Sequence, residues 1–235
     1  MEREPSRDPR RVRGMFAAVA SRYDLLNHLL SFNLDRRWRR AAAAEIRHPV
    51  SAVLDLCGGT GDLSLELARS GRADTVVCCD FSHEMLSRAT PKFRRNGADG
   101  ICLALEADGL RLPFRDARFD GVTVAFGVRN LADLDAGLRE IRRVLQPGGV
   151  MVVLEFSAPT RWPLSAAYRL YLHRVLPRIG QGVSGRGQAY RYLARTIAGF
   201  PDPASLAGRI REAGFAACGW QSRSGGIVAI HTAHR

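Results

Sequence analysis

Apolar residues in the central part of the chain come in short runs that alternate with segments of helical spacing. The short runs end in turn residues and predict strands, whereas apolar positions three and four residues apart predict helices. We expect strands at Ala52–Leu56, Thr75–Cys79, Ile101–Ala107, Phe119–Phe126 and Val150–Phe156, with helices between them at Asp62–Ser70, His83–Arg95 (Ser82 as N-cap) and Asp133–Leu145. Such alternation predicts an α/β fold with a mostly parallel sheet covered by helices on both faces.

Helical spacing also occurs on both sides of this region. We expect helices at Met15–Leu30 and Trp38–Ile46, then at Trp162–Ile179, Ala189–Ala198 and Ala204–Ala213, before a strand pair at Phe215–Ser222 and Gly226–Ala233. Residues 1–14 are basic and contain helix breakers, which predicts a disordered tail. Residues 15–235 then form one domain: an N-terminal helical lid (15–50), a cofactor-binding core (51–160), a helical substrate-side insertion (161–200) and a closing helix and strand pair (201–235).

The segment Val53–Asp62 reads V-L-D-L-C-G-G-T-G-D and has the order strand, glycine-rich turn, helix. In α/β proteins this arrangement brings backbone N–H groups close to a nucleotide. Glycine suits the turn because it adopts positive φ and has no Cβ to obstruct a ligand.

The residues around this turn favour one nucleotide over another. The dinucleotide fingerprint is incomplete because Ser64 stands at its third glycine, and the P-loop lysine is absent. Asp55 in the preceding strand suits the ammonium group of S-adenosylmethionine (SAM) and would repel a pyrophosphate. Asp80 follows about 20 residues beyond the turn, where an acid can accept hydrogen bonds from ribose hydroxyls. SAM therefore fits better than NAD, although a plain tight turn remains the alternative for the glycines.

The net charge of +12 lies on the flanks of the chain. Residues 1–40 hold ten arginines against five acids, and residues 161–195 hold seven arginines and no acid. An anionic membrane surface or nucleic acid could use such flanks. The competing explanation is compositional, because Lys92 is the only lysine and so strong an arginine bias can be merely solubilising.

Other composition features limit the cellular context. No apolar run is long enough for a membrane span, and the first residues lack the apolar stretch of a signal peptide. The five cysteines show no C-x-x-C spacing, and the six histidines show no metal-binding spacing. We therefore expect a cytoplasmic protein with reduced cysteines and no metal.

Several motifs resemble those of class I SAM-dependent methyltransferases: Asp55–Asp62, Asp80, Leu112–Asp120 and Leu138–Gly149. More specific segments resemble the menaquinone/ubiquinone biosynthesis C-methyltransferases, the UbiE/MenG-like family. These are Ser21–Asn27, Phe126–Asn130, Leu154–Ser157, Leu176–Gly180, Tyr190–Leu193 and Gly225–His231. The resemblance runs from about Met15 to the C-terminus. It implies a Rossmann-like, seven-stranded sheet with an antiparallel last strand, SAM as methyl donor and a polyprenylated quinol as acceptor.

The resemblance also implies a set of cofactor contacts. Thr60, in the turn with Gly58, Gly59 and Gly61, would contact SAM, and Asp80 would take the ribose. Asp108 and Gly109, after the third strand, would meet the adenine. The family usually has serine immediately before F-G-x-R-N, where this chain has Ala125, so one side-chain contact is missing. Asp80 as a helix cap and Asp108 as an ordinary loop acid are the structural alternatives.

Methylation of a quinol carbon requires positioning and removal of a hydroxyl proton, because the sulfonium methyl is already activated. Similarity to the family suggests Arg129, Asn130 beside it and Tyr23 on the lid for this step. Arginine is too basic to be the base itself, so stabilisation of the quinolate oxygen is the favoured role for Arg129. Arg129 as a structural ion pair and Tyr23 as lid core remain open.

Demethylmenaquinol is the first-choice acceptor, and the methoxy-polyprenyl-benzoquinol precursor of ubiquinone is the second, with one enzyme serving both as a further option. An RNA methyltransferase and a non-catalytic SAM-binding protein are more distant alternatives. The expected partners are the quinol substrate, an anionic membrane surface at the inner face through peripheral contact, and a second copy in a homodimer. No nucleic acid partner is expected.

Overall fold

A seven-stranded sheet organises the computed structural model, in which residues 12–15, 17, 20, 23–160, 162–171, 174 and 187–235 are described. The strands are β1 (Val50–Leu56), β2 (Ala73–Asp80), β3 (Cys102–Glu106), β4 (Phe119–Ala125), β5 (Leu145–Phe156), β6 (Ala217–Arg223) and β7 (Val228–His234). They lie in the order β3-β2-β1-β4-β5-β7-β6. The chain thus starts at the centre of the sheet, adds β2 and β3 on one side of β1, and then crosses over so that β4 lies on the other side of β1. In open α/β sheets, ligands bind at such a switch point.

Strand directions follow the predicted pattern. The pairs among β1 to β5 are all parallel. The last strand, β7, runs antiparallel between β5 and β6, for example with Val152 opposite Thr232. The α/β class, the seven strands and the antiparallel last strand are therefore confirmed.

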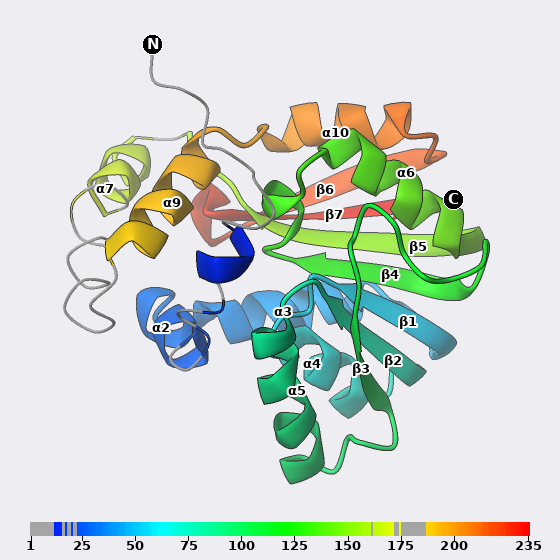
Figure 1. Cartoon of the computed structure of the whole chain (residues 1–235). Helices are drawn as coiled ribbons and strands as arrows, with labels where there is room; N and C mark the ends of the chain where they lie inside the picture. The colour runs from blue at the N-terminus through cyan, green and yellow to red at the C-terminus, as the bar shows by residue number, and fades with distance from the viewer. Residues whose placement is uncertain are drawn as a thin grey trace.

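Helices cover both faces of the sheet, as Figure 1 shows. Helices α3 (Leu34–Ala44), α4 (Asp62–Arg69) and α5 (His83–Arg95) pack on one face, and α6 (Leu134–Val144) and α10 (Pro203–Glu212) pack on the other. Trp38, Leu67 and Phe93 fill the first layer, and Leu138 and Ile210 fill the second. Burial of these side chains holds the strand ends in fixed register.

Several predicted boundaries move, for local reasons. Helix α6 ends at Val144, and β5 begins at once, because Leu145 pairs with Phe119 before a register shift around Pro147–Gly149. β4 ends at Ala125, since Phe126 takes a left-handed φ of 59°. Ser82 is the N-cap residue of α5, as predicted, although its side chain makes no capping hydrogen bond. Its hydroxyl donates to Glu84 instead (3.0 Å).

The N-terminal helices differ most from expectation. Residues 12–15 are helical and Val12 is buried, so the tail predicted through residue 14 is ordered at its end. Helix α2 spans Tyr23–Leu30, and α3 begins at Leu34, four residues earlier than predicted. The two are separated by a turn in which Phe32 and Asn33 have φ of 52° and 59°. Some residues of the predicted helix Met15–Leu30 lie outside the described part.

The insertion after β5 contains α7 (Leu164–Leu170) and α9 (Gly187–Ala198). Together with α2 these helices lie beyond one end of the sheet (Figure 1). Most of the predicted segment after Tyr171, including the L-P-R-I-G motif at Leu176–Gly180, lies outside the described residues. Within the described ranges, none of the helices has the length and apolar character needed to cross a bilayer.

Candidate functional site

The glycine-rich turn joins β1 to α4 and is packed tightly from below. Gly59 and Gly61 have φ of 57° and 81°, in the region that favours glycine. A Cβ at Gly58 would lie 2.6 Å from Cys78 Sγ, and one at Gly61 would collide with the Phe93 ring. The glycines of this turn are therefore dictated by φ and by the side chains packed against it.

Asp80 ends β2 directly beside the turn. Its two carboxylate oxygens accept separate backbone hydrogen bonds, from Gly59 N (2.9 Å) and from Ser82 N (2.9 Å). Only 7% of the residue is exposed, and burial raises the pKa of Asp80 to about 6 although those N–H groups oppose the shift. Each oxygen can still accept a second hydrogen bond. The structure thus places Asp80 where it braces the turn and keeps acceptor capacity.

Asp55 lies deeper than its predicted role requires. The residue has no exposed surface, and its oxygens accept from Ser64 Oγ (2.6 Å) and Thr123 Oγ1 (3.0 Å). Burial raises the pKa of Asp55 to about 6, against the two hydroxyls that lower it. In this geometry Asp55 ties β1 to α4 and β4 beneath the turn. Contact with a ligand's ammonium group stays a prediction.

A small polar network links helix α2 to the turn. Thr60 Oγ1 donates to Asp24 of α2 (2.5 Å). Lys92 Nζ lies 2.6 Å from both Asp24 and Asp62, which joins α5, α2 and the start of α4. The sequence singled out Thr60 but not its partners. The fact that Lys92 is the only lysine was the one available signal.

The remaining predicted cofactor residues lie at the same edge of the sheet. Asp108 follows β3, is exposed, and accepts from Leu110 N (2.9 Å) in a turn closed by Arg111. Gly109 is buried, and a Cβ there would approach Leu131 to 3.1 Å. Ala125 ends β4 and is partly buried.

Arg129 lies in a 3-10 turn, η2 (Val128–Asn130), and is buried. Its Nη1 lies 2.5 Å from Glu155 Oε1 and 2.7 Å from the Phe126 carbonyl, and the guanidinium stacks over the Phe156 ring at 5.3 Å. Burial raises the pKa of Glu155 even though the guanidinium opposes the shift. The structural ion pair that the sequence left open is therefore present, and Glu155 is its partner. The L-E-F-S motif contained Glu155, but no sequence rule paired it with Arg129.

Two buried polar atoms in this region have no hydrogen-bond partner among the described residues. They are Arg129 Nε and the hydroxyl of Tyr168, on α7. The charges of Arg129 and Glu155 both act on Tyr168, so the two orphaned groups lie in one neighbourhood. Native structures rarely leave buried donors unpaired. Tyr168 lies within the predicted helix Trp162–Ile179 at a position with helical apolar spacing, and that pattern does not indicate a role for its hydroxyl.

Tyr23 and Asn130 complete the predicted catalytic set. Tyr23, on α2, hydrogen-bonds Asn27, and the charges of Arg129 and Asp80 both act on it. Burial raises the pKa of Tyr23, partly offset by Arg129. Asn130 Oδ1 accepts from the Tyr192 hydroxyl of α9 (3.3 Å). The structure thus brings Tyr23, Arg129 and Asp80 together, with Asn130 linked to the insertion.

One cluster has the residue types of a metal site. Ligand atoms of His28, Asp35 and Asp62 lie within 4.8 Å of one another. A cation already occupies this position, because Arg39 Nη1 lies 2.5 Å from Asp35 and its Nη2 lies 3.8 Å from Asp62. The cluster is therefore an ion-pair network that joins α2, α3 and α4.

The sequence model of the ubiE/COQ5 methyltransferase family matches residues 5–235. This chain belongs to that family. A demethylmenaquinone methyltransferase from Mycobacterium marinum is 44% identical over 230 residues, covering 97% of this chain and 95% of that protein. One from Deinococcus radiodurans is 48% identical over 206 residues, covering 87% and 84%.

Solved structures show the same fold at low sequence identity. A SAM-dependent methyltransferase from Aquifex aeolicus has a TM-score of 0.55 at 16% identity over 78% of this chain and 81% of its own. The [4+2]-cyclase SpnF has a TM-score of 0.63 at 18% identity over 95% of each chain. These likenesses establish the Rossmann-like methyltransferase fold. The methyltransferase activity follows from the family, as predicted.

Proposed function

We propose that this protein transfers a methyl group from SAM to a ring carbon of demethylmenaquinol, giving menaquinol. The 44% identity to a demethylmenaquinone methyltransferase over nearly the whole of both chains supports this most strongly. The site supports it independently through the buried, unpaired donors beside the end of β4. The benzoquinol, RNA and non-catalytic alternatives have no comparable support.

The residues around the glycine turn fit SAM. Gly59 presents no Cβ on the side of Asp80, and the Asp80 oxygens keep room for two ribose hydroxyls. Asp108 and Gly109 would bound the adenine. The sulfonium of SAM supplies an activated methyl group. In this assignment the Asp55 carboxylate supports the turn from beneath, and its negative charge stabilises the ammonium group of SAM.

The acceptor chemistry needs charge on a quinol oxygen. Loss of the O–H proton to water would spread phenolate charge onto the neighbouring ring carbon. That carbon would take the methyl group as S-adenosylhomocysteine leaves, and loss of its own C–H proton to water would restore the aromatic ring. The protonated Arg129, held rigid by Glu155, would stabilise that oxygen through Nε, and the Tyr168 hydroxyl would hydrogen-bond the same or the opposite ring oxygen. The apolar walls of Phe156 and Tyr23 would exclude water, which strengthens these interactions.

The partner assignments extend this proposal. A quinol with a polyprenyl tail resides in a membrane, so peripheral contact of the α2 and α7 end of the protein with the bilayer is the corresponding expectation. Trp162 and Leu170 in this region are 82% and 53% exposed. Homodimerisation stays a prediction on which the structure gives no information.

Methyl transfer from labelled SAM in detergent tests the function. One reaction contains reduced demethylmenaquinol, and the parallel reaction contains the methoxy-polyprenyl-benzoquinol. We expect label in menaquinol and much slower labelling of the benzoquinol. SAM binding with no transfer to either quinol would contradict the proposal, and equal rates would show one site serving both acceptors.

A further inference from the structure

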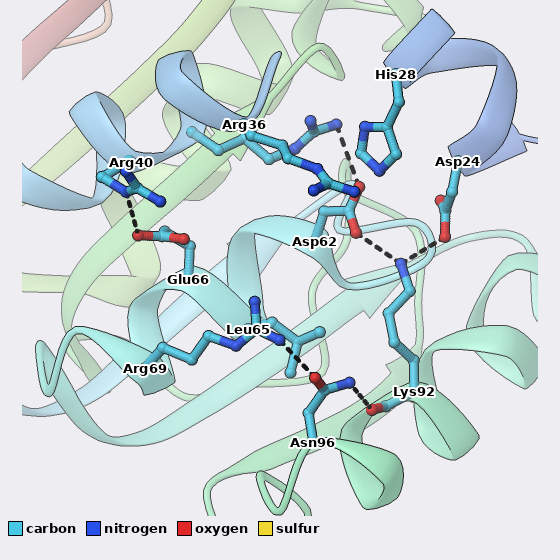
Figure 2. Close-up of a pocket in the computed structure, with 11 residues that line it drawn as sticks. Asp24, His28, Arg36, Arg40, Asp62, Leu65, Glu66, Arg69, Lys92 and Asn96 are labelled. Atoms are coloured by element: carbon cyan, nitrogen blue, oxygen red, sulfur yellow. Dashed lines mark hydrogen bonds and ion pairs between the residues drawn. The ribbon is translucent and has the colours of Figure 1, made fainter. Parts of the chain in front are cut away.

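A charged cavity lies between α2, α3, α4 and α5; its lining includes Asp24, Asp62 and Lys92 but not Asp80, Arg129 or Tyr168. Its volume is about 360 Å³, and its lining includes five cationic side chains and three carboxylates. Figure 2 shows the side chains of Arg36 and Arg40 from α3 and of Arg69 from α4 extending into the same space.

The three carboxylates of this cavity are already paired. Asp24 and Asp62 share Lys92, and Glu66 lies 3.4 Å from Arg40. By contrast, Arg36 forms no ion pair or hydrogen bond within the described part of the chain. Arg69 donates only to the neutral amide of Asn96 (2.5 Å). The cavity therefore has two guanidiniums whose charge no carboxylate balances, an arrangement that suits the bidentate binding of a phosphate group.

Exposed apolar side chains adjoin the cavity. Leu25 and Leu29 each follow a cavity-lining residue of α2, which places them one helical step around from that lining. They are 62% and 49% exposed, and Phe32, in the turn before α3, is 78% exposed. Arg36 follows Phe32 by four residues. An apolar edge next to unbalanced cationic charge is the composition of a surface that binds an anionic bilayer.

The opposite face of α2 belongs to the catalytic site. Tyr23 and Asn27 lie on it, roughly half a helical turn away from Leu25 and Leu29. Asp24 fastens the same helix to Thr60 of the glycine turn. A bilayer that holds the outer face of α2 thus also holds the helix that covers the acceptor side.

We propose that the Arg36–Arg69 cavity binds the phosphate of an anionic phospholipid headgroup while Leu25, Leu29 and Phe32 enter the bilayer. This site rests on the proposed function in one respect, because it would deliver the protein to the membrane that holds its lipid-tailed acceptor. The headgroup site also goes beyond the proposed function, since headgroup binding does not depend on catalysis.

Vesicle flotation of the full chain tests this site, using pure phosphatidylcholine and phosphatidylcholine mixed with phosphatidylglycerol. Arg36→Gln with Arg69→Gln should remove the preference for the anionic vesicles, about five-fold for each charge, or roughly 25-fold in total. Phe32→Ser should weaken binding to both kinds of vesicle alike. The matched control is Arg211→Gln with Arg223→Gln, which removes two exposed arginines far from the cavity in sequence and leaves its lining intact.

Each outcome decides the question. Equal loss of anionic preference in the control pair would overturn the site, because the effect would then be one of net charge. Thermal stabilisation by inorganic phosphate without any vesicle preference would overturn the lipid source in favour of a free phosphate. If vesicle binding is lost only when an acidic protein is added as a competitor, the occupant of the cavity would be a protein partner instead.

Methyl transfer in detergent separates this proposal from the proposed function. The Arg36 and Arg69 variants should keep that activity, because neither residue contacts the glycine turn or Arg129. If the protein transfers the methyl group but shows no preference for anionic vesicles in flotation, the headgroup site is wrong and the proposed function stands. A preference for anionic vesicles without methyl transfer would contradict the proposed function and leave the headgroup site standing.

Discussion

The two halves of the proposed site, one assigned to SAM and the other to the quinol, differ in how their polar groups are satisfied. On the cofactor side, the carboxylates of Asp55 and Asp80 accept hydrogen bonds from hydroxyls or backbone N–H groups of the protein itself. On the acceptor side, Arg129 Nε and the Tyr168 hydroxyl are buried without a partner among the described residues.

This difference shows how the two halves are built. The half assigned to SAM is formed by the ends of β1 and β2, where both carboxylates already accept hydrogen bonds from the protein. The acceptor half is formed between η2, α2 and α7, and it keeps unpaired donors in a dry environment, where a hydrogen-bond acceptor is worth most. Substitutions in the first half should therefore cost stability or cofactor affinity, and those in the second should cost rate.

The largest effect on rate is expected from Arg129→Gln combined with Glu155→Gln. Loss of the guanidinium should lower kcat by about 100-fold, the effect typical of removing one preorganised donor to a developing oxyanion. SAM affinity should stay unchanged. Single-turnover transfer and calorimetric SAM titration measure the two quantities.

The double substitution avoids a complication of the single one. Arg129→Gln alone leaves Glu155 charged, buried and unpaired, which should cost about 3–5 kcal/mol of stability. If the double variant loses SAM affinity as much as rate, then the two halves are not independent and the comparison fails.

The next effect concerns the free energy of unfolding. Gly61→Ala should lower it by about 3 kcal/mol, because a left-handed φ and a collision with the Phe93 ring act together. Gly71→Ala is the control: it has φ of 61° and open space, so about 1 kcal/mol is expected. Urea unfolding measures both. Equal losses would mean that packing under the turn contributes nothing.

The pH dependence of SAM binding should identify Asp80. Its pKa of about 6 means that the carboxylate gains a proton as the pH falls through 6 and loses acceptor capacity. Between about pH 7.5 and about pH 5, the dissociation constant of SAM should therefore rise roughly tenfold. Asp80→Asn should bind weakly and without this slope. Asp55→Asn should keep the slope; loss of the slope there instead would move the ligand contact to Asp55.

The smallest effect is expected from Tyr168→Phe, and its two components have opposite signs. Removing one neutral hydrogen bond to the acceptor should lower kcat about five-fold, whereas removing an unsatisfied buried hydroxyl should raise stability by about 1 kcal/mol. Tyr171→Phe serves as the neighbouring control. A less stable Tyr168→Phe protein would show that the hydroxyl already has a partner.

Sequence and structure agree where the determinants are local. The glycine turn, Asp80 at the end of its strand and the succession of strands and helices along the chain follow from spacing and periodicity, because each depends on a few consecutive residues, whereas the order of strands in the sheet does not. The pairing of Arg129 with Glu155, the attachment of Asp24 to Thr60 and the orphaned hydroxyl of Tyr168 join distant segments. Periodicity carries no information about such contacts, so Tyr168 was assigned only to an apolar face.

Left-handed backbone conformations shift two element boundaries from their predicted positions. The left-handed Phe32 and Asn33 separate α2 from α3, although neither residue type demands that conformation. Phe126 likewise ends β4 one residue early because Gly127 must approach Cys57 closely. Tertiary packing therefore explains the boundary at Phe126, whereas the turn before α3 is local, with Phe32 78% exposed.

The ionisation of bound demethylmenaquinol tests the acceptor half most directly. Anaerobic absorbance titration of the quinol bound with S-adenosylhomocysteine gives its pKa without turnover. The account predicts a quinol pKa at least about one unit lower in the wild-type protein than in the Arg129→Gln, Glu155→Gln variant, equivalent to about 1.4 kcal/mol of quinolate stabilisation. An equal pKa in both proteins would contradict the assignment of Arg129 to the quinol oxygen.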